Sequence, residues 1–387
     1  MSKQVEEILA DLVRFDTTSC NPNRACIDYI QDYLRGFGVA AEIVPNDDGS
    51  KASLWATVGD ANASGVALAG HTDVVPVEGQ TWTSDPFVLT ERGGKLFGRG
   101  CADMKGFIAC ALAMVPEFLE AQTGGCFHLA FTSDEETDFS GALRLADFLS
   151  CRKIKPLWVW VGEPTEFSII NQHKGCGAYA LRIKGVPGHS SQPDRGLSAI
   201  ELMGLALKEV VDMIEQKKRN PFPSSSFDPP YSTINLGTIK GGTAENIIAE
   251  ECELLWQVRT HPGDEAASII AEIESAVRSI LGPRLAAFAP RAKAEISELY
   301  SFPPFLGSSG NLAVATLQRV LKNAEIKAVA FATEAGIYQK VGAPVAICGP
   351  GSIAQAHQPD EFIDKKQISS CVDLMRLVLL SSPASAM

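Results

Sequence analysis

Short apolar runs that alternate with helix-like segments are the feature that most narrows the folds open to this chain. The runs are brief enough to be buried strands, and they read SLWATVG, GVALAG, CFHLAFTS and PLWVWVG. Segments with the length of helices alternate with them, namely MKGFIACALAMVPEFLEA and SGALRLADFLS. Nearer the start, VEEILADLVRF and ACIDYIQDYLRGFG have apolar residues at helical spacing. The alternation predicts an α/β layer with a mostly parallel central sheet.

From about Gly177 the pattern changes to long amphipathic helices and strands with partial alternation. The helices are GLSAIELMGLALKEVVDMIEQKKR and GDEAASIIAEIESAVRSIL, and the strands are AYALRIKGVPG, YSTINLGTIKGG and NIIAEECELLWQVRT. Two helices on an antiparallel sheet make an α+β domain, and the first pattern resumes after it. We therefore expect a two-domain protein. Residues 177–288 would form an inserted domain between the two parts, 1–176 and 289–387, of an α/β domain.

Composition disfavours several classes of partner. The chain has 387 residues and a formal net charge of −12, so nucleic acid and anionic membrane surfaces are poor partners. No stretch approaches the roughly 18 consecutive apolar residues that a membrane helix needs, and the first residues lack the apolar core of a signal peptide. The ten cysteines are scattered singly without a CxxC pair, which indicates reduced thiols in a cytoplasmic protein.

Acidic and histidine side chains follow the predicted strands directly. His71 comes after GVALAG, Glu135 and Glu136 come after LAFTS, and Glu163 comes after WVWVG. Ligands of parallel sheets gather at the carboxyl ends of strands, so these side chains mark a candidate site. The carboxylates of FTSDEETD repel one another unless a cation or a donor compensates them. By itself, such a cluster is more often a solvated acidic turn.

Two further motifs and one pair add candidate metal ligands. His71 and Asp73 lie two residues apart, and on an extended chain they point the same way, so one can bind a metal while the other orients it. Asp103 lies in GRGCADMKG, a glycine-rich turn entering a helix, and His357 lies in GPGSIAQAHQPDE. Each motif alone is more often structural. GPG does not indicate a phosphate loop, because no GKS or GKT follows it.

Taken together and in this order, the motifs resemble the co-catalytic zinc amidohydrolases and peptidases. That family includes acetylornithine deacetylase, succinyl-diaminopimelate desuccinylase and glutamate carboxypeptidase. The resemblance covers essentially the whole chain and rests on GHTDVVPVEGQTWTSDPF, LFGRGCADMKGFIA, SDEETDFSGA, VGEPT, KGVPGHSSQPDRGLSAIE and GPGSIAQAHQPDEF. The first and last segments are most similar to acetylornithine deacetylase. The implied fold is a catalytic α/β domain with an inserted lid and dimerisation domain, and the implied oligomer is a homodimer.

The resemblance also implies a site with two divalent metal ions bridged by Asp103. His71 and Glu163 would complete one metal position, and Glu136 and His357 would complete the other. Two histidines and three carboxylates suit zinc first, with cobalt or manganese as alternatives.

Other acidic residues near these ligands are expected to have different roles. The resemblance implies that Glu135 is the general base and that Asp73 braces the imidazole of His71. Asp134 and Asp138 are left as solvated or capping residues.

Four residues are expected to meet the substrate. On sequence alone His189, in PGHSS, is a surface or capping histidine, but the resemblance implies an oxyanion donor supplied across a dimer interface. Asn246 and Arg259 are candidate substrate contacts, and Arg259 could hold an α-carboxylate bidentately or form a structural ion pair. The family often has an acid two residues before this arginine, where this chain has Gln257. Glu334, in TEAGIYQKVG, is a candidate partner for a substrate amine.

The expected function is metal-dependent hydrolysis of the amide bond of an N-acyl amino acid, with N-acetylornithine of arginine biosynthesis first. Alternatives within the family are another N-acetyl amino acid such as acetylcitrulline, an N-succinyl amino acid, or a peptide cleaved by a dipeptidase or carboxypeptidase. A non-catalytic metal-binding protein is the alternative of another class. Loss of the base or of a ligand would mark such a protein, and none of these positions is lost here. His128, His173, His261 and the cysteines receive no role.

Overall fold

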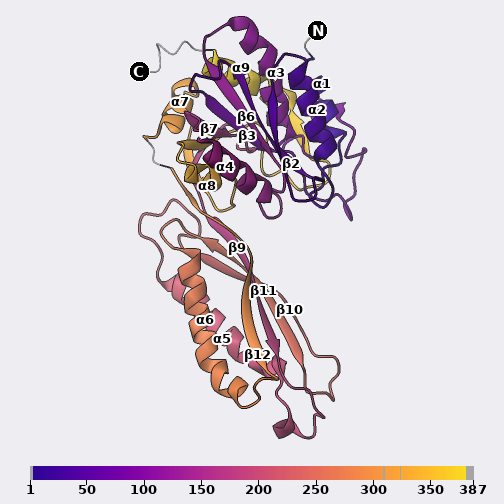
Figure 1. The fold of residues 1–387 in the computed structure, drawn as a ribbon, viewed down its shortest axis with the longest axis vertical. Coiled ribbons are helices and arrows are strands. Elements are labelled where there is room, and N and C mark those ends of the chain that lie inside the picture. Colours follow the sequence, from indigo (N-terminus) through magenta and orange to yellow (C-terminus); the bar gives the residue numbers. More distant parts are fainter. Residues whose placement is uncertain (1–2, 308–309, 323, 381–387) are drawn as a thin grey trace. The chain divides into compact units, whose positions relative to one another are not determined.

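The computed structural model describes residues 3–307, 310–322 and 324–380. The chain forms two compact units (Figure 1). The first comprises Met1–Asn171, Gly307–Lys327 and Thr333–Met387, and the second comprises Gln172–Leu306 and Ala328–Ala332.

Most strands of a nine-stranded sheet lie in the first unit and form its middle. Its order begins β1 (Ala41–Pro45), β2 (Ala52–Gly59), β6 (Cys126–Thr132), β3 (Val66–His71), β7 (Trp158–Val161), β15 (Val345–Ile347) and β8 (Ile169–His173). The two remaining strands, β13 (Phe305–Leu306) and β14 (Ile326–Val329), both pair with β8. The central strands β6, β3, β7 and β15 run parallel. Strands β3, β6 and β7 are buried along their whole length, which explains their continuous apolar runs.

Helices cover this sheet in two groups. Helices α1 (Val5–Val13), α2 (Arg24–Arg35), α3 (Lys105–Ala121), α7 (Leu312–Val320) and α9 (Lys365–Leu379) contribute to the main hydrophobic core. Helix α4 (Ser140–Arg152) packs outside that core against α8 (Ala335–Lys340). Helix α3 is buried on nearly all sides, as a helix with apolar residues all round must be. A small sheet of β4 (Thr90–Arg92), β5 (Lys95–Phe97) and β16 (Phe362–Asp364) completes the unit.

The second unit is a four-stranded antiparallel sheet with two long helices. The strand order is β10 (Thr233–Gly241), β11 (Glu251–Thr260), β9 (Gly175–Lys184) and β12 (Lys293–Phe302). Helices α5 (Ala199–Arg219) and α6 (Ala266–Ala286) pack on it over a separate core, and a 3-10 turn spans Pro193–Arg195. Burial alternates along β11, as it does in a strand with one face on a core. The predicted fold class, a mostly parallel α/β sheet with an α+β unit, is confirmed.

The limits of the second unit differ from the expected 177–288. Strand β12 follows residue 288 in the chain, yet it pairs with β9 from Lys293 opposite Lys184 to Phe302 opposite Cys176. It therefore belongs to the antiparallel sheet. The unit extends to Leu306 for this reason and begins at Gln172.

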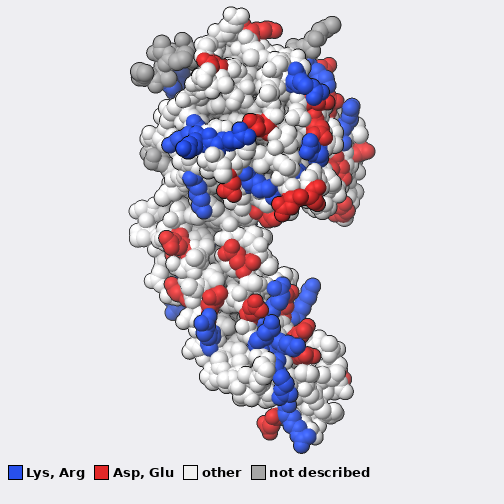
Figure 2. All heavy atoms as spheres, viewed as in Figure 1, with Lys and Arg blue, Asp and Glu red and all other residues white. Residues whose placement is uncertain are grey.

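Within the described residues, no helix has both the length and the apolar character needed to cross a membrane. On the face shown in Figure 2, acidic and basic side chains are interspersed, and much of the surface carries neither. The net charge of −12 is therefore not gathered into one patch on that face.

Candidate metal centre

His71, the last residue of β3, is buried and bonded through both ring nitrogens. Its Nδ1–H donates to the backbone carbonyl of Asp73 at 2.9 Å, and its Nε2 lies 3.1 Å from Oδ1 of Asp103. Burial alone would lower the pKa of His71, but the hydrogen bond with Asp103 and the charge of Glu135 raise it well above its ordinary value. The ring nitrogen that faces Asp103 must carry a proton here. A metal ion could take the place of that proton.

Asp103 lies between two histidines at the entrance to α3. Its second oxygen, Oδ2, is 3.5 Å from Nε2 of His357, so the carboxylate contacts one imidazole with each oxygen. Burial raises the pKa of Asp103, but the hydrogen bonds from His357 and His71 outweigh burial and hold it below its ordinary range. A carboxylate in this position is suited to bridge two cations.

His357 reaches Asp103 from an irregular segment near the C-terminus. Its Nε2 also lies 3.0 Å from Oε1 of Glu136, and its side chain is 48% exposed. The hydrogen bonds to Asp103 and Glu136 raise the pKa of His357 to about 10. The residue has a positive φ of 64°, an uncommon conformation that marks a tightly specified turn.

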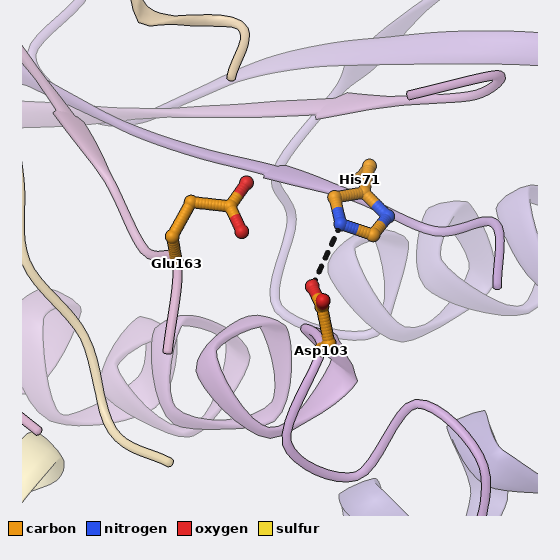
Figure 3. Close-up of side chains that lie close together, drawn as sticks. All are labelled: His71, Asp103 and Glu163. Carbon is orange, nitrogen blue, oxygen red and sulfur yellow. Dashed lines mark hydrogen bonds and ion pairs between the residues drawn. The ribbon is translucent and has the colours of Figure 1, made fainter. Parts of the chain in front are cut away.

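Glu163 approaches His71 and Asp103 from the loop after β7. Figure 3 shows its carboxylate pointing toward both residues. Its buried Oε1 has no hydrogen-bond partner among the described residues. Burial and the charge of Asp103 raise its pKa well above the ordinary value. The adjacent Gly162 is required by the packing of α3, because a Cβ there would lie 2.0 Å from the ring of Phe107.

Glu135 is buried beside Glu136 in the turn after β6. Burial raises the pKa of Glu135 well above its ordinary value. The positive charge of His71 opposes that rise, and the charges of Glu163 and Glu136 add to it. A buried carboxyl group with a raised pKa is suited to accept and return a proton.

Ligand atoms within 4.8 Å of one another occur in three groups of side chains. They are His71, Asp103 and Glu163; His71, Glu135 and Glu136; and Asp103, Glu136 and His357. Buried carboxylates that face one another, one with an unpaired oxygen, need a cation for compensation. The donor set of imidazole nitrogens and carboxylate oxygens therefore fits divalent metal ions, and the last group and the first share Asp103.

Asp73 makes its side-chain contacts mainly with the Glu135–Glu136 turn. Its carboxylate accepts hydrogen bonds from the backbone N–H groups of Glu135 at 3.1 Å and Glu136 at 3.2 Å, and from the Ser19 hydroxyl at 2.7 Å. Its Oδ1 is 3.6 Å from Nδ1 of His71. The nearest brace for the imidazole is thus the backbone carbonyl of Asp73, whereas its carboxylate holds the turn.

Asp134 differs from the expectation of a solvated or capping residue. Its carboxylate is buried and forms ion pairs with Lys51, and with Arg144 at 3.5 Å. The expectation failed because Lys51 lies in a segment far away in sequence. Asp138 is exposed and accepts a hydrogen bond from the backbone N–H of Ser140 at 3.0 Å, as a capping residue does.

Glu334 lies in the first unit and is buried, with 1% of its surface exposed. It accepts a hydrogen bond from the hydroxyl of Thr132, the last residue of β6. Burial raises its pKa to about 7. In this structure the carboxylate contacts the sheet beside the metal centre and is closed to solvent.

His189 and Asn246 are neighbours on the surface of the second unit. The backbone N–H of Ser190 donates to the carbonyl of Asn246 at 3.1 Å. Nδ1 of His189 accepts from the backbone N–H of Ser191 at 3.2 Å and lies 2.8 Å from its hydroxyl. Because Nδ1 is an acceptor, the proton of the neutral ring lies on Nε2, which is then a hydrogen-bond donor.

Arg259 lies on β11, opposite Thr233 of β10 and Cys176 of β9. Its Nε donates to Oε1 of Gln257 at 3.0 Å, and Gln257 in turn donates to the Tyr300 hydroxyl at 3.1 Å. A neutral amide therefore orients the guanidinium and leaves its positive charge uncompensated by that contact.

Two charged residues near the metal centre were missed by the sequence reasoning. Arg99 and Glu361 are each 1% exposed and form an ion pair of 2.8 Å across 262 residues of chain. Both lie inside the motifs GRGCADMKG and HQPDEF, which is the only signal that the sequence offered. His128 and His261, which had no assigned role, stack on Trp55 and Phe222.

Comparison with known proteins places this arrangement in a family. The model of peptidase family M20/M25/M40 matches residues 67–381. An acetylornithine deacetylase from Proteus mirabilis is 36% identical over 364 residues, which are 93% of this chain and 90% of that protein. Another, from Buchnera aphidicola, is 34% identical over 366 residues, which are 92% of each.

Solved structures agree in fold. An M20 family metallo-carboxypeptidase from Sulfolobus solfataricus has a TM-score of 0.79 at 16% identity, covering 99% of this chain and 100% of that one. A dinuclear metal-binding peptidase of the M20 family from Bacillus subtilis has a TM-score of 0.65 at 14% identity, covering 97% and 96%. At such identities the likeness concerns the fold alone. The family match and the deacetylase relatives span most of the sequence, and this chain therefore belongs to peptidase family M20/M25/M40, a family of hydrolases.

Proposed function

We propose that this chain hydrolyses N-acetylornithine to ornithine and acetate with the help of two divalent metal ions. The observation that carries the proposal is the convergence of two histidines and two glutamates on Asp103, in a chain whose relatives at 34–36% identity are named acetylornithine deacetylases. Those relatives match over at least 90% of both chains, so the similarity extends over nearly the full length of this sequence and of theirs.

The metal ligands would be divided around Asp103. His71 and Glu163 would complete one position, and Glu136 and His357 the other, in agreement with two of the groups of ligand atoms described above. Nitrogen and oxygen donors of this kind suit zinc, with cobalt or manganese as substitutes. Divalent ions bound there supply a Lewis acid for an amide carbonyl and make water more acidic.

Glu135 would carry the proton of the reaction. It is buried, its pKa is raised, and its backbone is held by the carboxylate of Asp73. The ionised carboxylate takes a proton from the water molecule that attacks the amide carbonyl. The resulting carboxylic acid then gives this proton to the nitrogen of the leaving amine, because an amine leaves only after it is neutralised.

The second unit would supply contacts to the substrate. The Nε2–H of His189 is a donor for a developing oxyanion, in line with its accepting Nδ1. Arg259, oriented by Gln257, would bind the α-carboxylate of the amino acid, and Asn246 would bind beside His189.

We further propose that the chain is a homodimer in which His189 acts on the partner's substrate. Its ten free cysteines favour a reducing compartment, the cytoplasm.

The experiment is an assay of metal-loaded protein against a panel of N-acetyl amino acids, N-succinyl amino acids and dipeptides. We expect the highest kcat/KM for N-acetylornithine, complete loss of hydrolysis after chelation, and recovery with zinc or cobalt. A preference for acetylcitrulline, a succinylated amino acid or a dipeptide would correct the substrate. Full turnover by protein in which elemental analysis finds no metal would contradict the mechanism.

A further inference from the structure

The carboxylate of Glu361 binds the turn that carries Asp103. Its Oε1 accepts hydrogen bonds from the backbone N–H groups of Ala102 at 2.9 Å and Asp103 at 3.1 Å. Its Oε2 accepts from the backbone N–H of Gly100 at 3.1 Å. Three backbone donors of the glycine-rich turn are thus satisfied by one buried carboxylate. The backbone of Asp103 is fixed by a residue from the far end of the chain.

Arg99 fixes Glu361 and the segment around it. Its Nη1 lies 2.8 Å from Oε2 of Glu361 and 3.3 Å from the carbonyl of Gln358. Its Nη2 donates to Oε1 of Gln80 at 2.5 Å and to the carbonyl of Pro76 at 3.4 Å. One guanidinium therefore ties the segment that follows His357 to the loop that follows β3.

The same cluster also holds His357 itself. The side-chain amide of Gln80 donates to the backbone carbonyl of His357 at 3.0 Å. The ring of Trp82 covers the guanidinium of Arg99 at 5.0 Å from its centroid. Glu361 is four residues beyond His357, so it connects the segment of one candidate ligand to the backbone of another.

We propose that Glu361, held by Arg99, is a positioning residue that sets Asp103 against His357 and so completes the metal position formed by Asp103, Glu136 and His357. The inference rests on the proposed function of the site. It predicts an unequal effect on the two positions: Asp103 belongs to both, but the other ligands of the first position, His71 and Glu163, stand at the ends of β3 and β7 and are placed by the sheet. His357 is placed by the irregular segment that Arg99 and Glu361 hold.

A purely structural role for the pair makes a different prediction. Removing one partner of a buried ion pair destabilises a protein, whereas replacing both partners by uncharged residues restores much of the loss. Glu361→Gln leaves Arg99 unpaired, and the double variant Arg99→Met/Glu361→Gln does not. In both variants the glutamine amide presents N–H donors to the turn, so at least one N–H group of the turn loses its acceptor.

The test measures zinc bound per chain by equilibrium dialysis over a range of free zinc, followed by elemental analysis. We expect two ions in the wild type. In Glu361→Gln and in the double variant we expect the second ion to bind about 10- to 100-fold more weakly, the usual effect of losing a residue that orients a ligand. The ion held by His71 and Glu163 should be weakened less, because only Asp103 among its ligands depends on Glu361. The cobalt-loaded variants should lack the absorption of the second ion. The double variant should unfold at a higher temperature than Glu361→Gln without regaining the second ion.

Glu117→Gln is the matched control, because it removes the partner of Arg376 from a pair that lies outside the metal centre. It should bind two ions like the wild type. Two ions of unchanged affinity in the Glu361 variants, equal weakening of both ions, or recovery of the second ion in the double variant would each overturn the inference and leave the proposed function intact. A wild-type chain that binds fewer than two ions would overturn the metal assignment and this inference with it. If Glu361→Gln does not fold, the double variant carries the test.

Discussion

Replacing Asp73 by asparagine tests whether its carboxylate holds the turn of the proposed general base. In the wild type this carboxylate accepts hydrogen bonds from the backbone N–H groups of Glu135 and Glu136 and from the hydroxyl of Ser19. The asparagine has one accepting oxygen, and its NH2 group faces donors. At least one buried N–H of the turn is then unsatisfied, at a cost of about 1 to 3 kcal/mol.

The assay is hydrogen exchange followed by mass spectrometry on peptides that cover residues 131–139, in protein kept metal-free with chelator. A cost of about 1 to 2 kcal/mol corresponds to an increase in exchange of about 5- to 30-fold at these amides. Metal is left out so that the contact between Asp73 and the backbone is measured apart from metal binding. The control is Asp138→Asn, because Asp138 is an exposed carboxylate of the same turn that accepts from Ser140. It should change exchange little at Glu135 and Glu136.

Two results are distinguished by this experiment. If Asp73 acted mainly on the imidazole of His71, exchange of the turn would be unchanged, and metal affinity would fall by about 10- to 100-fold. Unchanged exchange at Glu135 and Glu136 in Asp73→Asn would therefore refute the reasoning from the backbone contacts.

Three further predictions concern the candidate metal centre and His189 of the second unit. Glu135→Gln should retain both metal ions and lower kcat by about 100- to 10,000-fold, whereas Glu136→Gln should lose metal. Equal loss of metal in both variants, measured by elemental analysis, would contradict the assigned roles. His189→Ala should keep its metals and lower kcat by about 100- to 1000-fold. Mixing this variant with Glu135→Gln should restore activity when the subunits exchange. If activity does not return although exchange is verified, His189 does not act on the partner's site. In metal-free protein the raised pKa of His357 adds stability that is full below pH 6.5 and is lost as pH rises toward about 10. The unfolding temperature of wild type relative to His357→Gln should fall over that interval, and a constant difference would mean that His357 does not titrate there.

Local sequence determined the elements that form the core of the site. The continuous apolar runs before His71, Glu135 and Glu163 are strands buried along their whole length. Parallel neighbours end at the same edge of the sheet, so the side chains that follow them are brought together. We could expect these side chains to gather without knowing the strand order, because the pattern and length of each apolar run identify it as a buried strand.

Tertiary structure decided which partner each charged group has. The DEE stretch does not show that Asp134 is buried against Lys51, nor that Asp73 binds backbone groups of the turn. The boundary of the second unit was equally hidden, because β12 joins the antiparallel sheet by pairing with a strand more than a hundred residues earlier. The pair of Arg99 and Glu361 joins positions 262 residues apart. Propensity and periodicity act over a few residues, whereas the partner of a buried charge is set by whichever segments the folded sheet brings within about 3 Å of it.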